Sequence, residues 1–166
     1  LFFSPISAMA RTQNIKIIDN LFKKSREKFT ERIFNPGEVR SVLDHLKKGN
    51  NCLYAPDQDY GYKSSIFIEF FGHKALTVKF PSVSVRIANC DVYIFSLEKR
   101  KLKYKIFLKK LEITGESLED DLREINSSIE EYIKSNLDNY LWSHRRFKNR
   151  PDSEEHFYPK ALLRKR

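Results

Sequence analysis

Two short stretches of the chain combine side chains that could do chemistry. The first, "YAPDQDYG" at residues 54–61, places Asp57 and Asp59 two positions apart, with aromatic residues, a proline and a glycine beside them. Two nearby carboxylates could bind a metal ion, orient a cation, or cap the loop through ordinary turn hydrogen bonds. The pattern predicts an acidic loop and leaves these three interpretations open.

The second stretch, "YLWSHRRFKNRP" at residues 140–151, joins a tryptophan to five actual or potential cations: His144, Arg145, Arg146, Lys148 and Arg150. Guanidinium groups bind phosphate and carboxylate groups through paired hydrogen bonds, so the stretch could form an anion site. It could equally be a basic helix end, where cations lie favourably against the last carbonyl groups and Trp142 packs in the core.

The charge of the whole chain favours anionic partners. Its 166 residues hold 31 Lys and Arg against 22 Asp and Glu, a net charge of +9. Nucleic acid, phospholipid headgroups and acidic substrates all fit this balance. The length predicts one domain, and no run approaches the ~20 apolar residues of a membrane-spanning helix. Cys52 and Cys90 lack metal-like spacing and are expected to be free thiols.

Periodicity and turn residues predict the elements that must position these stretches. A helix is expected over Lys16–Lys28, with Ile17, Ile18, Leu21 and Phe22 on one face. A second helix is expected from Asn35, its cap, to Gly49, with Pro36 in the first turn. A third helix begins at Ser117, which pairs with Asp120 in a capping box. The apolar stripe of this helix consists of Leu118, Leu122, Ile125, Ile129 and Ile133.

Between these helices lie runs rich in β-branched and aromatic residues. Strands are predicted at 51–55, 64–72, 91–99 and 103–113, the last two joined by a basic turn. Residues 75–90 are ambiguous, because β-branched residues favour a strand while the position between two strands favours a connecting helix. Helices alternating with strands predict an α/β layered domain.

Taken together, the two opening stretches resemble the bacterial lipid A biosynthesis acyltransferases, the lauroyl/myristoyl transferase family. The acidic loop, followed by "SSIFIEFFG", matches the family's Tyr-Ala-Pro-Asp-x-Asp-Tyr-Gly and Ser-x-Phe-x-x-Phe-Phe-Gly patterns. The later stretch matches Tyr-x-Trp-x-His-Arg-Arg-Phe-Lys-x-Arg-Pro. "RTQNIKIID", residues 11–19, matches an upstream family segment more weakly, since Thr12, Ile15 and Lys16 depart from it.

The resemblance implies a fold and an activity. The fold is a glycerolipid-acyltransferase-like mixed β-sheet flanked by helices, with residues 11–158 as the C-terminal part of the domain. Residues 1–10 are expected to be a poorly matching or foreign segment, and residues 159–166 a basic tail. The activity is transfer of a fatty acyl chain from acyl carrier protein to a hydroxyl of the lipid A precursor, at the cytoplasmic face of the inner membrane, with no metal or other cofactor.

The family's catalytic dyad is a His-x-x-x-x-Asp/Glu motif, in which the histidine deprotonates the acceptor hydroxyl. None of the four histidines here has an acidic residue five positions on; the pairs are His45 with Asn50, His73 with Val78, His144 with Asn149, and His156 with Ala161. The dyad and the family's N-terminal membrane helix are therefore expected upstream of Leu1. The chain by itself is expected to be inactive.

The resemblance also assigns roles to residues of this chain. Arg26 and Asp57 match positions tied to activity, as an ion pair supporting the active site or with Arg26 stabilising the thioester oxyanion. The acidic loop is expected to contact residues 140–150, with an arginine neutralising one aspartate. The expected substrate-binding residues are Arg11, Asn14, Asp59, His144, Arg145 and Arg146. For Arg145 and Arg146, the alternatives are lipid phosphate or the protein's own carboxylates.

A second hypothesis needs no enzyme: a basic module that binds anionic lipid or nucleic acid. The charge supports it, but no RNP, zinc or helix-turn-helix signature is present and the basic residues are scattered among acids. The expected partners are therefore acyl carrier protein, the lipid A precursor and the anionic inner-membrane surface, and no nucleic acid.

Overall fold

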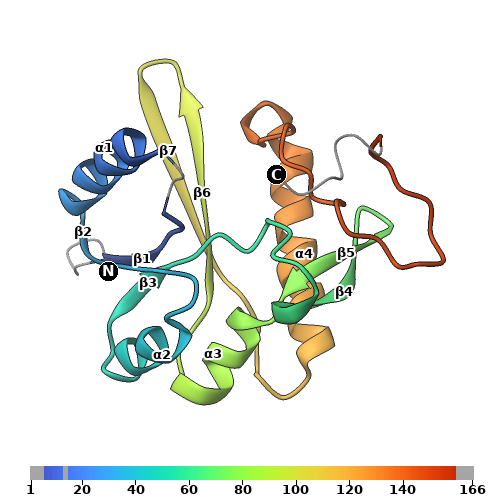
Figure 1. Cartoon of the computed structure of the whole chain (residues 1–166), viewed down its shortest axis with the longest axis horizontal. Coiled ribbons are helices and arrows are strands. Elements are labelled where there is room, and N and C mark those ends of the chain that lie inside the picture. Colours follow the sequence, from blue (N-terminus) through green and yellow to red (C-terminus); the bar gives the residue numbers. More distant parts are fainter. Residues whose placement is uncertain (1–5, 13–14, 160–166) are drawn as a thin grey trace. The chain divides into compact units, whose positions relative to one another are not determined.

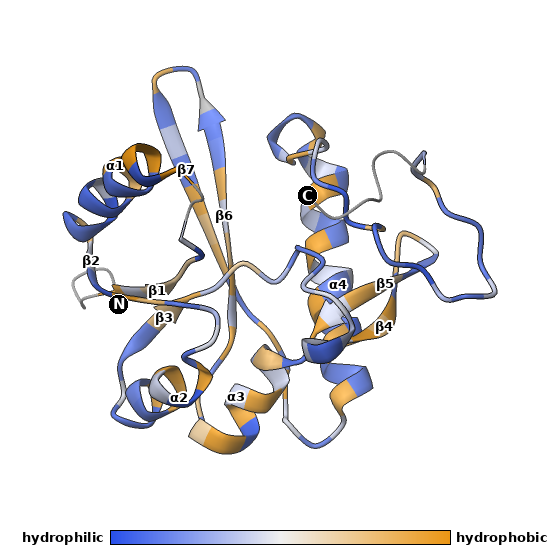
Figure 2. Ribbon diagram, in the orientation of Figure 1, coloured by the Kyte–Doolittle hydropathy of each residue, from blue (hydrophilic) through white to orange (hydrophobic). Residues whose placement is uncertain are grey.

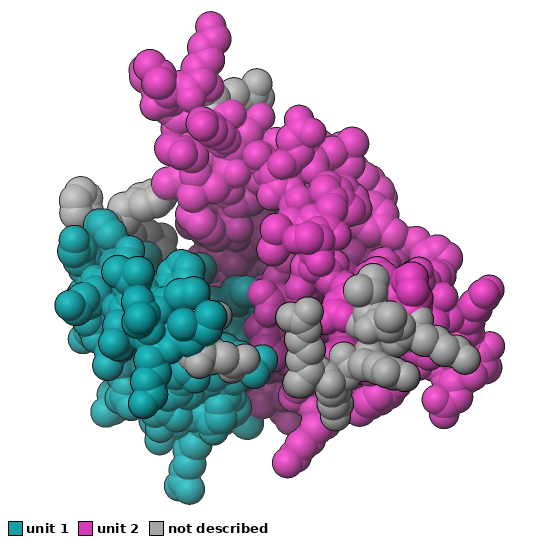
Figure 3. Space-filling model, turned by 45° about the horizontal axis from the view of Figure 1, so that its top comes forward, with its two compact units in different colours: residues 1–55, 87–90 teal, residues 56–86, 91–166 magenta. Residues whose placement is uncertain are grey.

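A computed structural model describes residues 6–12 and 15–159 of the chain. The chain divides into two compact units, residues 1–55 with 87–90 and residues 56–86 with 91–166 (Figure 3). The predicted site residue Asn14 and most of the predicted basic tail lie outside the described residues.

The first unit is built on a small parallel sheet (Figure 1). Its strands are β1 (Ile6–Met9), β2 (Thr30–Phe34) and β3 (Asn51–Leu53), in the order β2-β1-β3. Parallel neighbours need long crossovers, and the helices α1 (Lys16–Glu27) and α2 (Val39–Lys47) supply them. β3, α1 and α2 match the prediction, whereas β1 and β2 were not anticipated from the pattern.

The core of the first unit is formed where α2 covers the sheet, by the buried side chains Ala8, Phe34, Val42 and Leu43. The predicted cap of α2 is wrong: the helix begins at Val39, and its N-cap residue is Glu38, whose N–H donates to the Asn35 backbone carbonyl at 2.9 Å. The Glu38 carboxylate accepts from the Asn35 backbone N–H at 2.6 Å and from its side-chain amide at 3.2 Å. The Asn35 side chain therefore donates in this turn, and the helix starts beyond it.

The second unit contains two antiparallel hairpins. β4 (Ser65–Phe70) pairs with β5 (His73–Val78), and β6 (Tyr93–Arg100) pairs with β7 (Lys103–Lys110). The strands β4, β6 and β7 and the pairing of the last two were predicted, whereas the pairing of β4 with β5 was not. The ambiguous segment is both strand and helix, since β5 gives way to α3 (Phe80–Ala88). Pro81 explains the switch, because a proline cannot donate to a strand ladder but is tolerated in a first helical turn.

Helix α4 (Leu118–Ser135) organises the second unit. Its predicted cap is confirmed, since the Ser117 hydroxyl accepts from the Asp120 N–H. Its predicted apolar stripe is also confirmed: Leu122, Ile125, Ile129 and Ile133 are buried with Ile68, Phe70, Ala75 and Leu111. Figure 2 shows hydrophobic residues along β4 and β5, the strands that pack against this helix. Short 3-10 turns, η1 (Tyr62–Ser64) and η2 (Leu137–Asn139), complete the unit.

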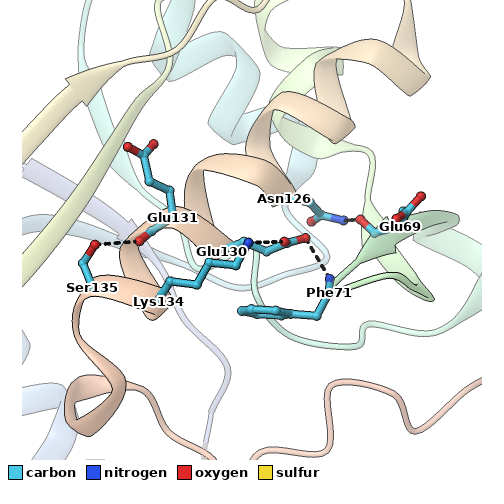
Figure 4. Close-up of polar contacts among 7 residues, drawn as sticks. All are labelled: Glu69, Phe71, Asn126, Glu130, Glu131, Lys134 and Ser135. Carbon is cyan, nitrogen blue, oxygen red and sulfur yellow. Dashed lines mark hydrogen bonds and ion pairs between the residues drawn. The ribbon is translucent and has the colours of Figure 1, made fainter.

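Polar contacts fix the β4–β5 hairpin against α4 (Figure 4). Phe71 and Gly72 in its turn both have positive φ, 50° and 74°. Glu130 accepts the Phe71 N–H at 2.8 Å, and Lys134 pairs with Glu130 and lies over the Phe71 ring. Farther along, the Asn126 amide donates to the Glu69 carbonyl. These contacts fix β4 and the turn of the hairpin, and β5 is paired with β4 along its whole length.

The α/β class predicted from the sequence is thus confirmed, and the strands of residues 6–12 and 15–159 are distributed over three small sheets. Within the described residues, none of the helices combines the length and apolar character that crossing a bilayer requires.

Candidate functional site

The acidic loop is shaped by one of its own aspartates. The Asp59 carboxylate accepts the Gly61 N–H at 2.9 Å, closing an Asx turn, and Gly61 has a φ of +78° that favours glycine. The η1 turn follows directly and leads into β4. Asp59 therefore has a structural role in the loop, one of the three interpretations left open above.

The same carboxylate joins the loop to the basic stretch. Asp59 accepts from the Asn149 backbone N–H at 2.9 Å and from the Asn149 side-chain amide at 2.9 and 3.0 Å. The Tyr62 hydroxyl adds a bond to the Arg150 carbonyl at 3.2 Å. The predicted contact between the two stretches is confirmed. The hydrogen bonds to Asp59 come from Asn149 and not from an arginine, whereas Arg146 acts on Asp57 and Asp59 electrostatically.

Arg146 is buried and points at the protein's own backbone. Its terminal nitrogens donate to the Leu76 carbonyl at 2.5 Å and to the Thr77 hydroxyl at 3.0 Å, and its guanidinium lies 5.1 Å from the centre of the Phe70 ring. Burial lowers the pKa of Arg146 from its ordinary value, while Tyr140, Asp57 and Asp59 act in the opposite direction. This placement favours packing over the alternative of lipid phosphate.

Arg150 fastens the end of the stretch in the same way. It donates to the Lys74 carbonyl at 3.1 Å and to the Glu155 carbonyl at 3.3 Å, and pairs with Glu154. Its guanidinium lies 4.1 Å from the centre of the Phe157 ring. Arg146 and Arg150 thus both bind to β5, and they hold the basic stretch on that strand.

Trp142 does not anchor the stretch in the core, contrary to the sequence-based interpretation. Its side chain is 61% exposed, and the indole N–H donates to the Leu137 carbonyl at 2.7 Å. The ring meets Tyr140 edge-on, with centroids 5.0 Å apart. Because α4 ends at Ser135, the stretch lies past the helix, and the buried arginines are its anchors.

Asp57 influences polar groups of the basic stretch through its charge. It acts electrostatically on Tyr140, His144 and Arg146. Burial lowers the pKa of His144 and Asp57 opposes that shift, whereas burial and Asp57 both raise the pKa of Tyr140. The His144 ring is therefore neutral near pH 7, because its pKa lies below an ordinary value of 6.5.

Three buried polar atoms around Asp57 make no hydrogen bond to the described part of the chain: the Tyr140 hydroxyl, His144 Nε2 and Arg146 Nε. Buried polar atoms usually have partners, so this group is a candidate place for water or a ligand oxygen. Of the three, only His144 and Arg146 were predicted as site residues. Tyr140 was missed, although its position at the start of the matched stretch could have signalled it.

The remaining predicted residues are placed as follows. Arg145 is half-buried in the basic stretch. Arg11 is exposed, and Arg26 lies on α1 with its guanidinium 5.4 Å from the centre of the Phe22 ring. Arg26 belongs to the first unit and Asp57 to the second, so their proximity stays a prediction.

Burial raises the pKa of Cys52 to about 11, which keeps the thiol protonated at neutral pH. Within residues 6–12 and 15–159, no three His, Cys, Asp or Glu side chains are grouped in a way that could hold a metal ion. The arrangement at Asp57 can instead orient polar groups and bind oxygen atoms.

Comparison with known proteins gives this site its context. The chain is 28% identical over 159 residues to the lipid A biosynthesis palmitoleoyltransferase of Escherichia coli, covering 93% of this chain and 52% of that protein. The identity and the coverage of both chains are the same for a lipid A biosynthesis acyltransferase of Shigella flexneri. The lipid A biosynthesis lauroyltransferase of Escherichia coli is 28% identical over 148 residues, 86% of this chain and 48% of that protein.

The chain spans about half the length of these curated relatives. The match to the family described as bacterial lipid A biosynthesis acyltransferase extends over residues 4–149, which includes β1, the acidic loop and nearly all of the basic stretch. The chain therefore belongs to the bacterial lipid A biosynthesis acyltransferase family.

Proposed function

We propose that this chain is the C-terminal portion of an enzyme that transfers a fatty acyl chain from acyl carrier protein to a hydroxyl of the lipid A precursor. Family membership and the names of the relatives support the reaction class. The single structural observation that supports a site here is the group of unpaired buried polar atoms on residues that Asp57 influences electrostatically.

In this proposal Asp57 is a supporting residue. A carboxylate held by a rigid loop can orient a cation or a substrate hydroxyl, and its effect is greatest where water is excluded. Arg26 is proposed as its partner, either in an ion pair or as the group that stabilises the thioester oxyanion. Asp59, Arg146 and Arg150 support the loop indirectly, through the hydrogen bonds that hold the basic stretch.

Substrate binding is assigned to residues other than the two arginines that hold the basic stretch on β5. Arg145 is the proposed contact for phosphate on the lipid A precursor, since both terminal nitrogens of Arg146 donate hydrogen bonds to β5. His144 offers an unpaired Nε2 to the substrate, and Arg11 and Asn14 are proposed to contact it from the upstream segment. The enzyme is proposed to work at the cytoplasmic face of the inner membrane, whose anionic headgroups fit the positive charge of the chain.

A chimera tests the proposal and the role of Asp57. The matching segment of the Escherichia coli palmitoleoyltransferase is replaced by this chain, and acylated lipid A is measured by mass spectrometry. We expect the chimera to acylate the precursor and Asp57→Asn to lower the rate by about two orders of magnitude, as for loss of a preorganised charged group.

The matched control is Asp152→Asn, which removes a carboxylate from an exposed position just past the basic stretch. This variant should keep the rate of the unmodified chimera. Equal rates for the two variants would remove Asp57 from the proposed site. A stable, folded chimera that binds no lipid A precursor would contradict the proposed function itself.

A further inference from the structure

The positive charge of the chain is concentrated in one hairpin. Residues 93–110, which form β6, β7 and their turn, hold seven Lys and Arg against one Glu, so they contribute +6 of the net +9. Figure 2 shows hydrophilic residues prevailing toward the turn end of this hairpin. A charge density of this kind attracts an anionic surface.

The turn itself presents an apolar side chain to solvent. Arg100 pairs with Lys103 in the ladder, which leaves Lys101 and Leu102 as a two-residue connection. Lys101 has a φ of +53°, and Leu102 is 99% exposed. Glycine, asparagine and aspartate suit such turns best, and a leucine gains nothing from exposure to water. Stability of the hairpin therefore does not explain Leu102.

The strands leading to the turn combine the same two properties. Every residue of β7 is exposed, and alternation places Leu97, Tyr104 and Ile106 on one face, at exposures of 42%, 66% and 47%. Lys99 lies opposite Tyr104 on that face. Aromatic and aliphatic side chains flanked by lysines suit the boundary between headgroups and acyl chains, where lysine stems lie in apolar surroundings and their ammonium groups reach phosphate.

The opposite end of the hairpin is fixed to the second unit. Lys109 pairs with Glu131 of α4 at 3.2 Å, and Leu111, just past β7, is buried in the core. Midway along the hairpin, the Tyr132 hydroxyl donates to the Leu97 carbonyl at 2.9 Å. The turn therefore extends from an ordered base.

We propose that the tip of the β6–β7 hairpin, residues 99–105, docks on an anionic phospholipid leaflet. Leu102 enters the boundary between headgroups and acyl chains, and Lys99, Lys101, Lys103 and Lys105 bind lipid phosphate. A purely electrostatic partner, such as an acidic protein or a nucleic acid, would account for the lysines but not for the fully exposed leucine at their centre. The inference rests on the membrane location in the proposed function and specifies the surface responsible.

Co-sedimentation of the full 166-residue chain with vesicles tests the inference. We expect binding to phosphatidylcholine vesicles that contain phosphatidylglycerol, little binding to phosphatidylcholine alone, and a decrease with added salt. Replacing Lys101 and Lys103 by glutamine should weaken binding about thirtyfold, at roughly fivefold for each cation near the surface. Leu102→Ser should weaken it roughly tenfold, through lost apolar burial.

The matched control replaces two exposed lysines of α1, Lys24 and Lys28, by glutamine and should bind as the parent does. Because α1 is also basic and carries exposed apolar residues, an equal loss in this control would overturn the inference. The inference would also be overturned if the parent did not bind the vesicles. The same holds if replacing Lys101 and Lys103 weakened binding while Leu102→Ser did not.

A second measurement guards against loss of the fold. Thermal unfolding must give each tip variant the midpoint of the parent. The tryptophan fluorescence of Leu102→Trp should be quenched by phospholipids brominated on their acyl chains. The quenching should exceed that of the parent, whose single tryptophan, Trp142, gives the background. No additional quenching would overturn the inference. The vesicles contain neither acyl donor nor lipid A precursor, so the result does not depend on whether acyl transfer occurs.

Discussion

At the scale of single residues, chemically similar side chains of the basic stretch have different structural roles. Arg146 and Arg150 are buried and bind carbonyl groups of β5, whereas Arg145 stays partly accessible. Asn149 takes the contact with Asp59 that an arginine was expected to make. Within one motif, Arg146 and Arg150 therefore anchor the stretch on β5 and Asn149 connects it to the acidic loop. Arg145 is the candidate contact for a substrate.

The pKa of His144 gives this scale a testable pH dependence. Burial holds the folded-state pKa below the ordinary value of 6.5, so between those two values the unfolded chain binds more protons than the folded chain. The stability contributed by neutral His144 is fully present above pH 6.5 and is lost as the pH falls through that range.

We expect the free energy of unfolding to fall less between pH 7.5 and pH 5.5 in His144→Gln than in the parent, as measured by urea denaturation at both values. His156→Gln, which removes an exposed histidine, is the matched control. A parallel decrease in parent and His144→Gln would contradict the assignment.

At the scale of elements, tight contacts with the start of α4 hold the second unit together. Asp121 is buried and accepts from the Ser82 hydroxyl at 2.6 Å and from the Thr114 and Gly115 N–H groups at 3.0 Å. Gly115 has a φ of +75° and lies against Arg86, whose backbone nitrogen would be 2.8 Å from an added Cβ. The loop before α4 therefore requires a glycine for both its conformation and its space.

Gly115→Ala should lower the free energy of unfolding by roughly 2–4 kcal/mol, from the left-handed backbone and the contact with Arg86 together. Gly37→Ala is the matched control, because its Cβ would meet nothing within 4 Å and its φ is not positive. That variant should be neutral or slightly stabilising. Chemical denaturation of both variants measures the difference, and a Gly115→Ala protein as stable as Gly37→Ala would show that the loop can rearrange.

At the scale of the whole molecule, the chain spans about half the length of the curated relatives it matches. The acidic loop, the basic stretch and β5 form one connected group in the second unit, while Arg26 belongs to the first. The proposed catalysis needs, in addition, a base within hydrogen-bond reach of the acceptor hydroxyl.

We expect the 166-residue chain by itself to transfer no acyl groups, because none of its histidines has an acidic residue at the family's spacing. General-base assistance is worth about two to four orders of magnitude in rate. The assay offers the purified chain acyl-acyl carrier protein and the lipid A precursor, and compares turnover with an enzyme-free control. Turnover that His144→Ala abolishes and His73→Ala leaves unchanged would identify His144 as a base and contradict the expectation.

Much of the molecule followed from local patterns. The stripe and cap of α4, the strands on either side of the basic turn and the α/β class could be read from the sequence, because each depends on neighbours a few positions away. The family could be read from two motifs whose order and residues are specific. The strand β1 could not, because four residues between parallel neighbours carry little periodicity of their own.

Only the tertiary structure decided which partner each polar side chain takes. Asp59 and Asn149 are ninety positions apart, and Arg146 and Leu76 seventy, so their hydrogen bonds depend on where the folded backbone brings them. The residue type alone does not distinguish an arginine that binds a carbonyl inside the protein from one that is accessible to a ligand. The direction of each side chain, and the burial that sets the pKa of His144, arise from packing between distant segments.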